Sequence, residues 1–344
     1  MGVATTMGFP FQPCFVLLFV AIALISLVAT ASTARPSHMS TALLIRVDQS
    51  GKGDFKTVQD AIDSVPSNNS NVVFIWVKPG TYREKVVVPA GKPYITLSGS
   101  NPTTTIITWN DSGVIFQSPT LSVLATDFVA RYLTIQNTHG PGSQAVALRV
   151  SADRAAFYAC RILSYQDTIL DDTGRHYYRN CYIEGQTDFI CGNGASLFEK
   201  CHLHSLSEGA GAITAQHRES PAENTGFTFL GCRITGVGTA VLGRPWGAYS
   251  RVVFALSYIS NVILPQGWDN WGDPTKQSTA YYGEYKCYGA GANVSGRVEW
   301  SHNLSNAEAA PFLTKDMIGG RGWLRPSPTR FIGRASTKAV NGNI

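Results

Sequence analysis

Four segments between residues 157 and 234 repeat one pattern: FYACRI (157–162), YRNCYI (178–183), FEKCHL (198–203) and FLGCRI (229–234). Each segment opens with an aromatic residue, has cysteine at its fourth position and ends with an aliphatic residue, and the cysteines are 21, 20 and 31 residues apart. Such a unit is too short for a strand, a helix and a second parallel strand, which together need about 30 residues. A repeat of about 20 residues with short strands is typical of a solenoid.

The repeats therefore predict an all-β fold, a single-domain right-handed parallel β-helix whose long loops form a substrate cleft. Successive coils of such a helix lie about 4.8 Å apart, so equivalent positions stack. The four cysteines should then form an interior ladder. One short helix is expected around TVQDAIDSV (57–65), where apolar residues recur at helical spacing. The alternative is a chance recurrence in an ordinary β-sandwich.

The N-terminus carries an uncharged apolar run, CFVLLFVAIALISLVAT (14–30), and the small residues at 29–31 fit a signal-peptidase site. We expect a signal peptide over 1–31, a short tail over 32–42 and the β-helix domain over 43–340. The protein would then be secreted and extracellular, with no membrane attachment after cleavage. An uncleaved anchor is the alternative, although 17 apolar residues is near the lower limit for a membrane span.

The amino-acid composition and net charge limit the classes of molecule that this protein could bind. Charged residues make up 15% and aromatic residues 11% of the 344 residues, which excludes a disordered chain. The net charge is +5, but no run of basic residues is present, so we expect no nucleic-acid partner. A mildly basic protein favours an acidic partner such as an acidic polysaccharide.

Secretion also gives meaning to the glycosylation sequons and the cysteines. Candidate N-glycosylation sites lie at Asn68, Asn110, Asn293 and Asn303. Removal of the signal peptide leaves six cysteines, which is too few for a disulfide scaffold in a chain of this length. We expect one or two bridges that staple a self-sufficient core.

Two carboxylates share one position in the repeat. Asp167 lies seven residues after Cys160, and Asp188 lies seven residues after Cys181. Stacked coils would place their backbones about 5 Å apart. Two carboxylates that close repel each other, so the pKa of at least one should rise, which divides acid and base roles between them. The alternatives are an accidental stack of two solvated aspartates, or the carboxylate pair of a retaining glycosidase.

The neighbouring residues favour acyl transfer. Gln166 precedes Asp167, and Gln144 opens the string QAVAL; amide N–H groups beside a carboxylate pair indicate an oxyanion hole. Arg244 in LGRPW would pair with one aspartate and keep it ionised. Trp246 in the same string offers a flat face for a sugar ring.

At these motifs the sequence resembles the plant pectinesterases, or pectin methylesterases. The resemblance runs from about residue 43 to residue 326 and rests on several ordered motifs, which are more specific together than any is alone. The matching strings are GTYRE (80–84), QAVAL (144–148), YQDT (165–168), DFI with a following GN (188–193), LGRPW (242–246), GW with a following Trp271 (267–271), and the spaced pattern GxGxFxTVQxAI (51–62).

The resemblance implies a parallel β-helix and assigns catalytic roles. Asp188 would attack the methyl-ester carbonyl of galacturonate as nucleophile. Asp167 would protonate the departing methanol and then act as general base for water. Gln144 and Gln166 would stabilise the oxyanion. Arg244 would hold Asp188 ionised and oriented.

The resemblance also implies the substrate and its contacts. Methyl-esterified homogalacturonan of the cell wall would bind to Arg244, Gln144, Trp246 and Trp268, and hydrolysis would give pectate and methanol. No metal or cofactor is implied. Cys201 and Cys232 are the pair most expected to form a disulfide. A proteinaceous pectinesterase inhibitor is a further expected partner, and we expect a monomer.

Two positions depart from the family pattern: Cys191 stands where Phe is common, and Leu170 where Tyr is common. We expect both to touch the cleft. Neither departure removes a proposed catalytic group, so esterase activity remains the favoured hypothesis. A pectin-backbone glycosidase or lyase on the same scaffold is the first alternative. A non-catalytic wall-polysaccharide binder is the second, and these two positions are the only features that point to it. Asp171 and Asp172 resemble the paired aspartates of polygalacturonases, but the accompanying strings are absent, so we expect a solvated turn there.

Overall fold

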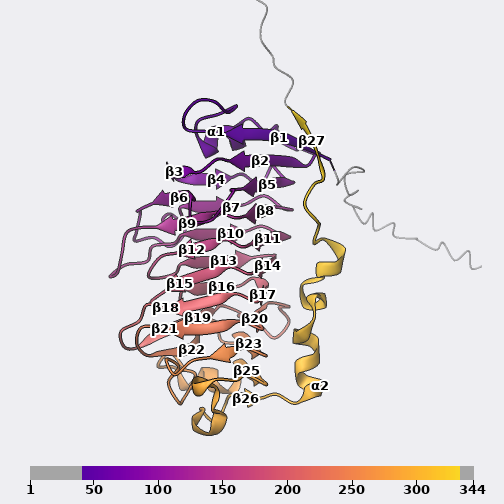
Figure 1. The fold of residues 1–344 in the computed structure, drawn as a ribbon. Helices are drawn as coiled ribbons and strands as arrows, with labels where there is room; N and C mark the ends of the chain where they lie inside the picture. The colour runs from indigo at the N-terminus through magenta and orange to yellow at the C-terminus, as the bar shows by residue number, and fades with distance from the viewer. Residues whose placement is uncertain (1–40, 334–344) are drawn as a thin grey trace, which may run out of the picture. The chain divides into compact units, whose positions relative to one another are not determined.

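The computed structural model describes residues 41–333. Within this range the chain passes through three parallel sheets in turn, here called A, B and C, and each circuit forms one coil of a right-handed β-helix (Figure 1). The coils stack so that every strand pairs with the equivalent strand of the next coil. The predicted parallel β-helix is confirmed.

The strands of each sheet are given in their spatial order. Sheet A contains β26 (His302–Asn303), β25 (Tyr281–Tyr285), β23 (Arg251–Ala255), β20 (Gly226–Leu230), β17 (Ala195–Glu199), β14 (Arg175–Arg179), β11 (Ala155–Tyr158), β8 (Val129–Arg131), β5 (Ile95–Ser98), β2 (Val73–Val77), β1 (Thr41–Val47) and β27 (Arg330–Gly333). Sheet B contains β24 (Tyr258–Ile259), β21 (Arg233–Gly236), β18 (His202–Ser205), β15 (Tyr182–Gly185), β12 (Arg161–Leu163), β9 (Thr134–Asn137), β6 (Thr105–Trp109) and β3 (Gly80–Arg83). Sheet C contains β22 (Ala240–Pro245), β19 (Gly211–Gln216), β16 (Ile190–Gly192), β13 (Ile169–Thr173), β10 (Leu148–Ser151), β7 (Leu121–Val123) and β4 (Val86–Val88).

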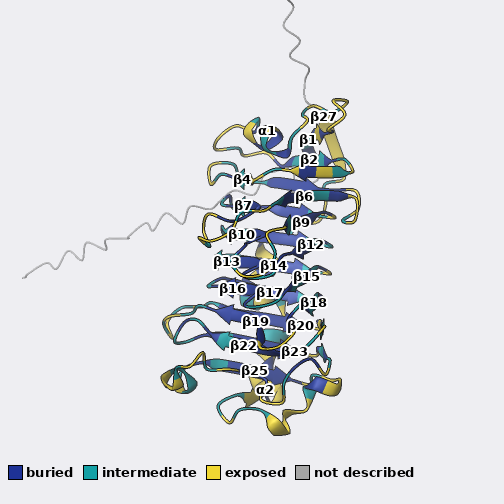
Figure 2. Ribbon diagram, turned by 90° about the vertical axis from the view of Figure 1, so that its left-hand side faces the viewer, coloured by how far each residue is buried: buried dark blue, intermediate teal, exposed yellow. Residues whose placement is uncertain are grey.

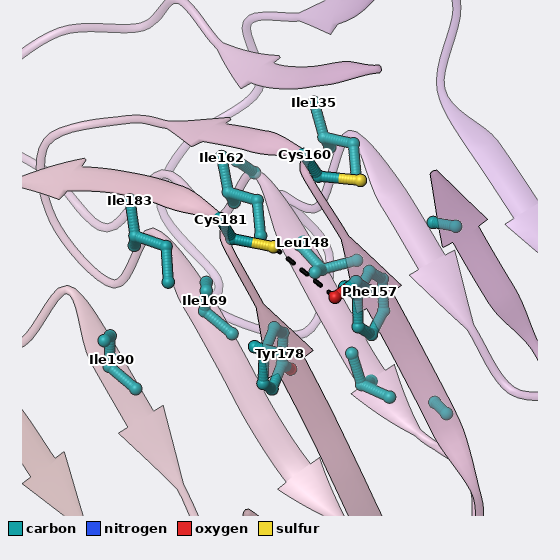
Figure 3. Close-up of a cluster of buried hydrophobic side chains, with 14 of the residues drawn as sticks. Ile135, Leu148, Phe157, Cys160, Ile162, Ile169, Tyr178, Cys181, Ile183 and Ile190 are labelled. Carbon is teal, nitrogen blue, oxygen red and sulfur yellow. Dashed lines mark hydrogen bonds between the residues drawn. The ribbon is translucent and has the colours of Figure 1, made fainter. Parts of the chain in front are cut away.

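The four cysteines of the repeat form the predicted interior ladder, and none is more than 2% exposed. Each follows a residue in the left-handed conformation, which turns the chain from sheet A into sheet B; Ala159 (φ 49°) and Lys200 (φ 55°) are two examples. Neither residue is a glycine, so stacking of the coils, and not local preference, holds this corner. Figure 3 shows two rungs, with the Cys181 thiol donating to the carbonyl of Phe157 on the preceding coil at 3.5 Å.

The predicted disulfide between Cys201 and Cys232 is absent. The six cysteines among the described residues are all free thiols, so the expectation of one or two bridges is also wrong for this structure. Cys201 donates to the carbonyl of Tyr178 at 3.5 Å, and Cys232 donates to that of Phe198 at 3.2 Å. Side chains at stacked positions point in the same direction, whereas a disulfide needs its two Cβ atoms to approach each other.

The aromatic residues that open the repeats form a second interior ladder. Ring centroids lie 4.9 Å apart between Phe157 and Tyr178, 4.4 Å between Tyr178 and Phe198, and 4.7 Å between Phe198 and Phe229. These rings are nearly parallel, and each such pair stabilises by about 0.5–1.5 kcal/mol beyond its buried area. Buried residues accordingly concentrate in the strands, while exposed residues lie in the loops (Figure 2).

The N-terminal end of the described chain is covered by α1 (Val58–Asp63), which confirms the expected helix. Thr57 caps it by accepting from the Asp60 backbone N–H, and Val58 packs into the core. Strand β1 begins at Thr41, so the last two residues of the expected tail already belong to the β-helix. The signal peptide (1–31) lies outside the described residues, as does the end of the expected domain beyond residue 333.

The C-terminal segment returns along the outside of sheet A (Figure 1). It contains α2 (Asn306–Ala309) and three short 3₁₀-helices, η4 (Ala310–Leu313), η5 (Lys315–Ile318) and η6 (Gly320–Gly322), while η1 (Pro274–Ser278), η2 (Ala290–Ala292) and η3 (Val294–Gly296) lie in the loops before it. Ile318 and Trp323 pack on Tyr177 and Leu197 of the sheet, and β27 finally pairs in parallel with β1. Among residues 41–333, no helix is long and apolar enough to span a bilayer.

Candidate active site

Asp167 and Asp188 occupy the same position on adjacent coils. Asp167 lies in the turn between β12 and β13, and Asp188 lies in the turn between β15 and β16. The strands that flank these turns pair in the predicted register, because Ile162 lies beside Ile183 and Ile169 beside Ile190. The cysteine spacing therefore predicted the register of the two carboxylates correctly.

Both aspartates adopt the left-handed conformation, with φ 59° for Asp167 and 48° for Asp188. The Asp167 backbone N–H donates to Thr187 at 3.2 Å, and that of Asp188 donates to Ala212 at 2.8 Å. Both side chains are about 95% buried. Two identical turns, each fixed by the next coil, thus hold two carboxylates side by side and largely out of water.

Arg244 reaches Asp188 from β22, two coils further along sheet C. Cys191, Ala215 and Arg244 are consecutive in register across β16, β19 and β22. The guanidinium donates from Nε to Oδ1 of Asp188 at 2.8 Å and from Nη2 to Oδ2 at 2.6 Å. This bidentate salt bridge fixes the orientation of the carboxylate and favours its ionised form. The expected pairing of Arg244 with Asp188 is therefore present.

The two carboxyl groups have different electrostatic surroundings. Burial, together with the negative charge of Asp188, raises the pKa of Asp167 to about 7, and a hydrogen bond from Gln144 only partly offsets this rise. Burial also raises the pKa of Asp188 above its ordinary value, but less, because Arg244 opposes the shift. Oδ2 of Asp167 is buried and has no hydrogen-bond partner among the described residues. Asp167 is thus suited to carry a proton, and Asp188 to carry a charge.

The two glutamines lie beside the carboxylates. Gln144 belongs to the turn before β10, one coil before Asp167, and its neighbour Ala145 donates a backbone hydrogen bond to Gln166 at 3.1 Å. Both glutamine side chains are half-buried. Amide donors at the edge of a buried carboxylate pair are suited to stabilise a developing oxyanion.

Trp246 and Trp268 have different environments. Trp246 is half-buried, and its ring stacks on His217 at 4.1 Å. Trp268 is only 1% exposed and stacks on Tyr282 at 4.4 Å inside the core. The expectation that Trp268 contacts a sugar is therefore wrong, because its ring is enclosed by other core side chains.

Trp271 is the tryptophan of this motif that reaches the surface. It is 38% exposed, and the Arg244 guanidinium carbon lies 4.0 Å from its ring centroid. The signal was present in the sequence, since Trp271 completes the GW…W string. Phe116 is a second exposed aromatic on this side, 4.7 Å from the Arg149 guanidinium, and no motif indicated it.

Leu170 and Cys191 lie in register with each other, next to the turns that carry Asp167 and Asp188, and their contact with a cleft stays a prediction. Both are 1% exposed and form a small apolar cluster on sheet C, against which Trp246 packs. Burial and the nearby carboxylates raise the pKa of the Cys191 thiol well above its ordinary value, so it is not a reactive thiolate. The two departures leave the contacts of Asp167 and Asp188 in place.

The Asp171–Asp172 pair is not a solvated turn, so that expectation is wrong. Both residues belong to β13, and Asp171 points into the core because it pairs in register with Val150. Its carboxylate is fully buried and accepts hydrogen bonds from the Tyr178 hydroxyl at 2.7 Å and the Ser196 hydroxyl at 2.5 Å. It also lies 3.0 Å from Nδ1 of His176.

The four sequon asparagines, Asn68, Asn110, Asn293 and Asn303, are all exposed. They are accessible to modification, and their glycosylation stays a prediction. A cleft shaped by the loops around the carboxylates likewise stays a prediction.

Comparison with known proteins identifies relatives of this arrangement. The family model described as Pectinesterase matches residues 44–321. The chain is 65% identical over 294 residues to putative pectinesterase 11 of Arabidopsis thaliana, covering 85% of this chain and 84% of that protein.

Comparison with solved structures also finds pectin methylesterases. The pectin methylesterase from carrot superposes with a TM-score of 0.79 at 40% identity, covering 81% of this chain and 94% of that one. A pectin methylesterase in complex with a hexasaccharide superposes with a TM-score of 0.71 at 28% identity, covering 83% of this chain and 98% of that one.

Proposed function

The chain belongs to the pectinesterase family of enzymes, and we propose that it is a secreted hydrolase that removes methyl esters from homogalacturonan, giving pectate and methanol. One observation carries this proposal. Asp188 is clamped by Arg244, while Asp167 on the adjacent coil has a pKa of about 7 and an oxygen without a partner in the described chain. A charged nucleophile and a protonated acid in adjacent turns suit acyl transfer at neutral pH.

In the first half-reaction, a carboxylate oxygen of Asp188 attacks the carbonyl carbon of a galacturonate methyl ester. The electron pair of the carbonyl moves onto its oxygen, which accepts hydrogen bonds from the amides of Gln144 and Gln166. When this intermediate collapses, the bond to the methoxy oxygen breaks, and Asp167 gives its proton to that oxygen. Methanol leaves, and the galacturonate remains joined to Asp188 as an anhydride.

In the second half-reaction, water attacks the same carbonyl carbon. Asp167, now ionised, takes a proton from this water and so returns to its starting state. The bond to the Asp188 oxygen breaks, which restores the carboxylate held by Arg244. The new galacturonic acid ionises in water, and the net products are pectate, a proton and methanol.

Binding of the polymer would involve the side chains around the carboxylates. The exposed ring of Trp271 and the half-buried ring of Trp246 lie near Arg244 and offer flat faces to sugar rings. The N-terminal apolar run supports secretion to the cell wall, where a monomer would meet its substrate and a proteinaceous inhibitor of pectinesterases.

The test measures methanol and new chain ends together, using the purified protein and highly methylated pectin. We expect methanol from the wild type without new reducing or unsaturated ends. Asp188→Asn should release no methanol, because an amide is a poor nucleophile, and it should melt at a temperature close to that of the wild type. Asp60→Asn, an exposed change on α1, is the matched control. New ends without methanol would assign the chemistry to the glycosidic bond, and near-normal turnover by Asp188→Asn would exclude this nucleophile.

A further inference from the structure

The outer side of sheet B carries a row of cationic and aromatic side chains that the proposed catalytic site does not use. Four members directly follow the cysteines of the interior ladder, and the other two follow Ser257 and Cys287, which donate to the preceding coil in the same way, so the row has one residue in each of six successive coils. These residues are Arg161, Tyr182, His202, Arg233, Tyr258 and Tyr288, here called the sheet B ladder. Every neighbouring pair in this order is in register.

Side chains of the ladder contact each other at four of its five steps. The Arg161 guanidinium lies 4.7 Å from the Tyr182 ring centroid, and that ring lies 5.1 Å from His202, edge to face. Further along, the Arg233 guanidinium lies 5.4 Å from the Tyr258 ring, which is 5.7 Å from Tyr288. Between His202 and Arg233 the two halves are joined by the pairing of their strands, so the row extends over five coil steps, which corresponds to about 24 Å.

The ladder is accessible. Tyr288 is 60% exposed, Arg233 is also exposed, and the other four members are half-buried. The nearest acidic side chain along the strands is Glu184, which accepts a hydrogen bond from the Tyr182 hydroxyl at 2.8 Å. No member of the ladder is itself acidic, so the row presents positive charge and aromatic faces together.

This combination is suited to a linear acidic polysaccharide. Guanidinium groups recognise carboxylates through paired hydrogen bonds, and tyrosine rings offer apolar faces to sugar rings. A straight row of about 24 Å is longer than a small ligand needs but suits a polymer. A neutral methyl ester offers no charge to the arginines, so the ladder should prefer polymer whose esters have been removed.

We propose that the sheet B ladder is a second binding site for polysaccharide, specific for de-esterified homogalacturonan. The choice of polymer rests on the proposed function. The ladder lies where the strands of sheet B begin, whereas the catalytic carboxylates lie beyond their ends. Arg161 and Asp167 are six residues apart, at most about 20 Å along the chain. One partly de-esterified polymer could then contact both sites, and binding of its charged stretch at the ladder would raise the local concentration of its remaining methyl esters at the carboxylates.

The test compares the binding of long polygalacturonate with that of a short galacturonate oligomer. The wild type should bind the long polymer more tightly than the oligomer, because only the long polymer contacts both sites. Arg161→Gln/Arg233→Gln should weaken binding of the long polymer about tenfold and reduce its salt dependence. Tyr258→Ala/Tyr288→Ala should weaken binding through lost stacking. Turnover of a short methylated oligomer should be unchanged in both variants.

Lys52→Gln/Lys56→Gln is the matched control, because it removes two exposed charges from the loop before α1. The proposal is overturned if the arginine variant binds the long polymer as tightly as the wild type, or if the lysine control weakens binding equally. It fails independently of the proposed function if methanol release is normal while binding does not depend on the ladder. Conversely, ladder-dependent binding without any methanol release would support the ladder and reject the esterase.

Discussion

Arg244 donates two hydrogen bonds, of 2.8 and 2.6 Å, to the carboxylate of Asp188, which lies 56 residues earlier in the chain. The contact exists because two further coils place β22 beside β19 and β19 beside β16, so that an arginine on sheet C reaches a turn two coils away. Asp167, one coil before Asp188, has no such partner. This difference between two otherwise equivalent turns separates a charged carboxylate from a protonated one.

Removal of the Arg244 charge should shift the acidic limb of the pH–rate profile. Arg244 opposes the rise of the Asp188 pKa, so Arg244→Gln should raise this pKa further, and the rate should begin to fall at a higher pH on acidification. Methanol release measured between pH 4 and 9 would show the shift. Arg154→Gln, which breaks a comparable pair with Asp127, is the control and should leave the limb in place. An unmoved limb in Arg244→Gln would contradict the role given to this pair.

The alkaline limb should report Asp167. Since the acid must be protonated in the first step, and its pKa is about 7, kcat/KM should fall above about pH 7. The hydrogen bond from Gln144 lowers this pKa, so Gln144→Ala should move the alkaline limb upward. It should also reduce the rate by about 10²–10³ if the amide stabilises the oxyanion. A loss below about threefold with an unmoved limb would reduce Gln144 to a positioning residue.

Substitution of Trp268 should affect mainly the stability of the fold, whereas substitution of Trp271 should affect mainly the binding of pectin. Trp268→Ala removes a fully buried ring and should lower the free energy of unfolding by about 3–5 kcal/mol. Trp271→Ala removes an exposed ring beside Arg244 and should raise KM for pectin severalfold without a comparable loss of stability. Denaturant unfolding and steady-state kinetics on both variants would check this. The opposite assignment of effects would restore Trp268 to the substrate site.

The buried Asp171–His176 pair should contribute to stability. Asp171→Asn leaves the His176 ring without its charged partner and should cost about 3–5 kcal/mol. The neighbouring Asp172→Asn, on a partly exposed ion pair with Arg149, should cost far less. Thermal melting of both variants is the measurement, and equal losses would reject a special role for the buried pair.

The Asp171–His176 pair should also make the stability of the folded protein depend on pH. Burial by itself lowers the pKa of His176, but Asp171 outweighs this, so the pKa in the folded protein lies above its ordinary value of 6.5. The resulting stabilisation is fully present below pH 6.5 and is lost as the pH rises through the raised pKa. The melting temperature of the wild type should therefore decline over that range more than that of Asp171→Asn.

Much of this architecture could be predicted from local spacing. Cys160 and Cys181 marked equivalent positions, and counting seven residues from each was enough to place Asp167 and Asp188 in adjacent turns. Such counting works because a β-helix repeats its backbone, so residues at one offset meet across the coils. The same counting predicted the interior ladder. The Cys201–Cys232 bridge was instead an implication of the family resemblance, and it failed because a disulfide depends on the direction of the side chains and not on their register.

The sequence by itself determined the coil, the register of the carboxylates and the identity of the residues around them, because these follow from a period that is encoded locally. Only the tertiary structure decided whether each remaining side chain faces the interior of the β-helix or the solvent. Trp268 is enclosed and Trp271 exposed, Asp171 enters the core, and β27 returns past the whole stack to pair with β1. These outcomes depend on packing between segments far apart in the chain. Such packing removes particular side chains from water, and a short-range sequence pattern does not specify which ones.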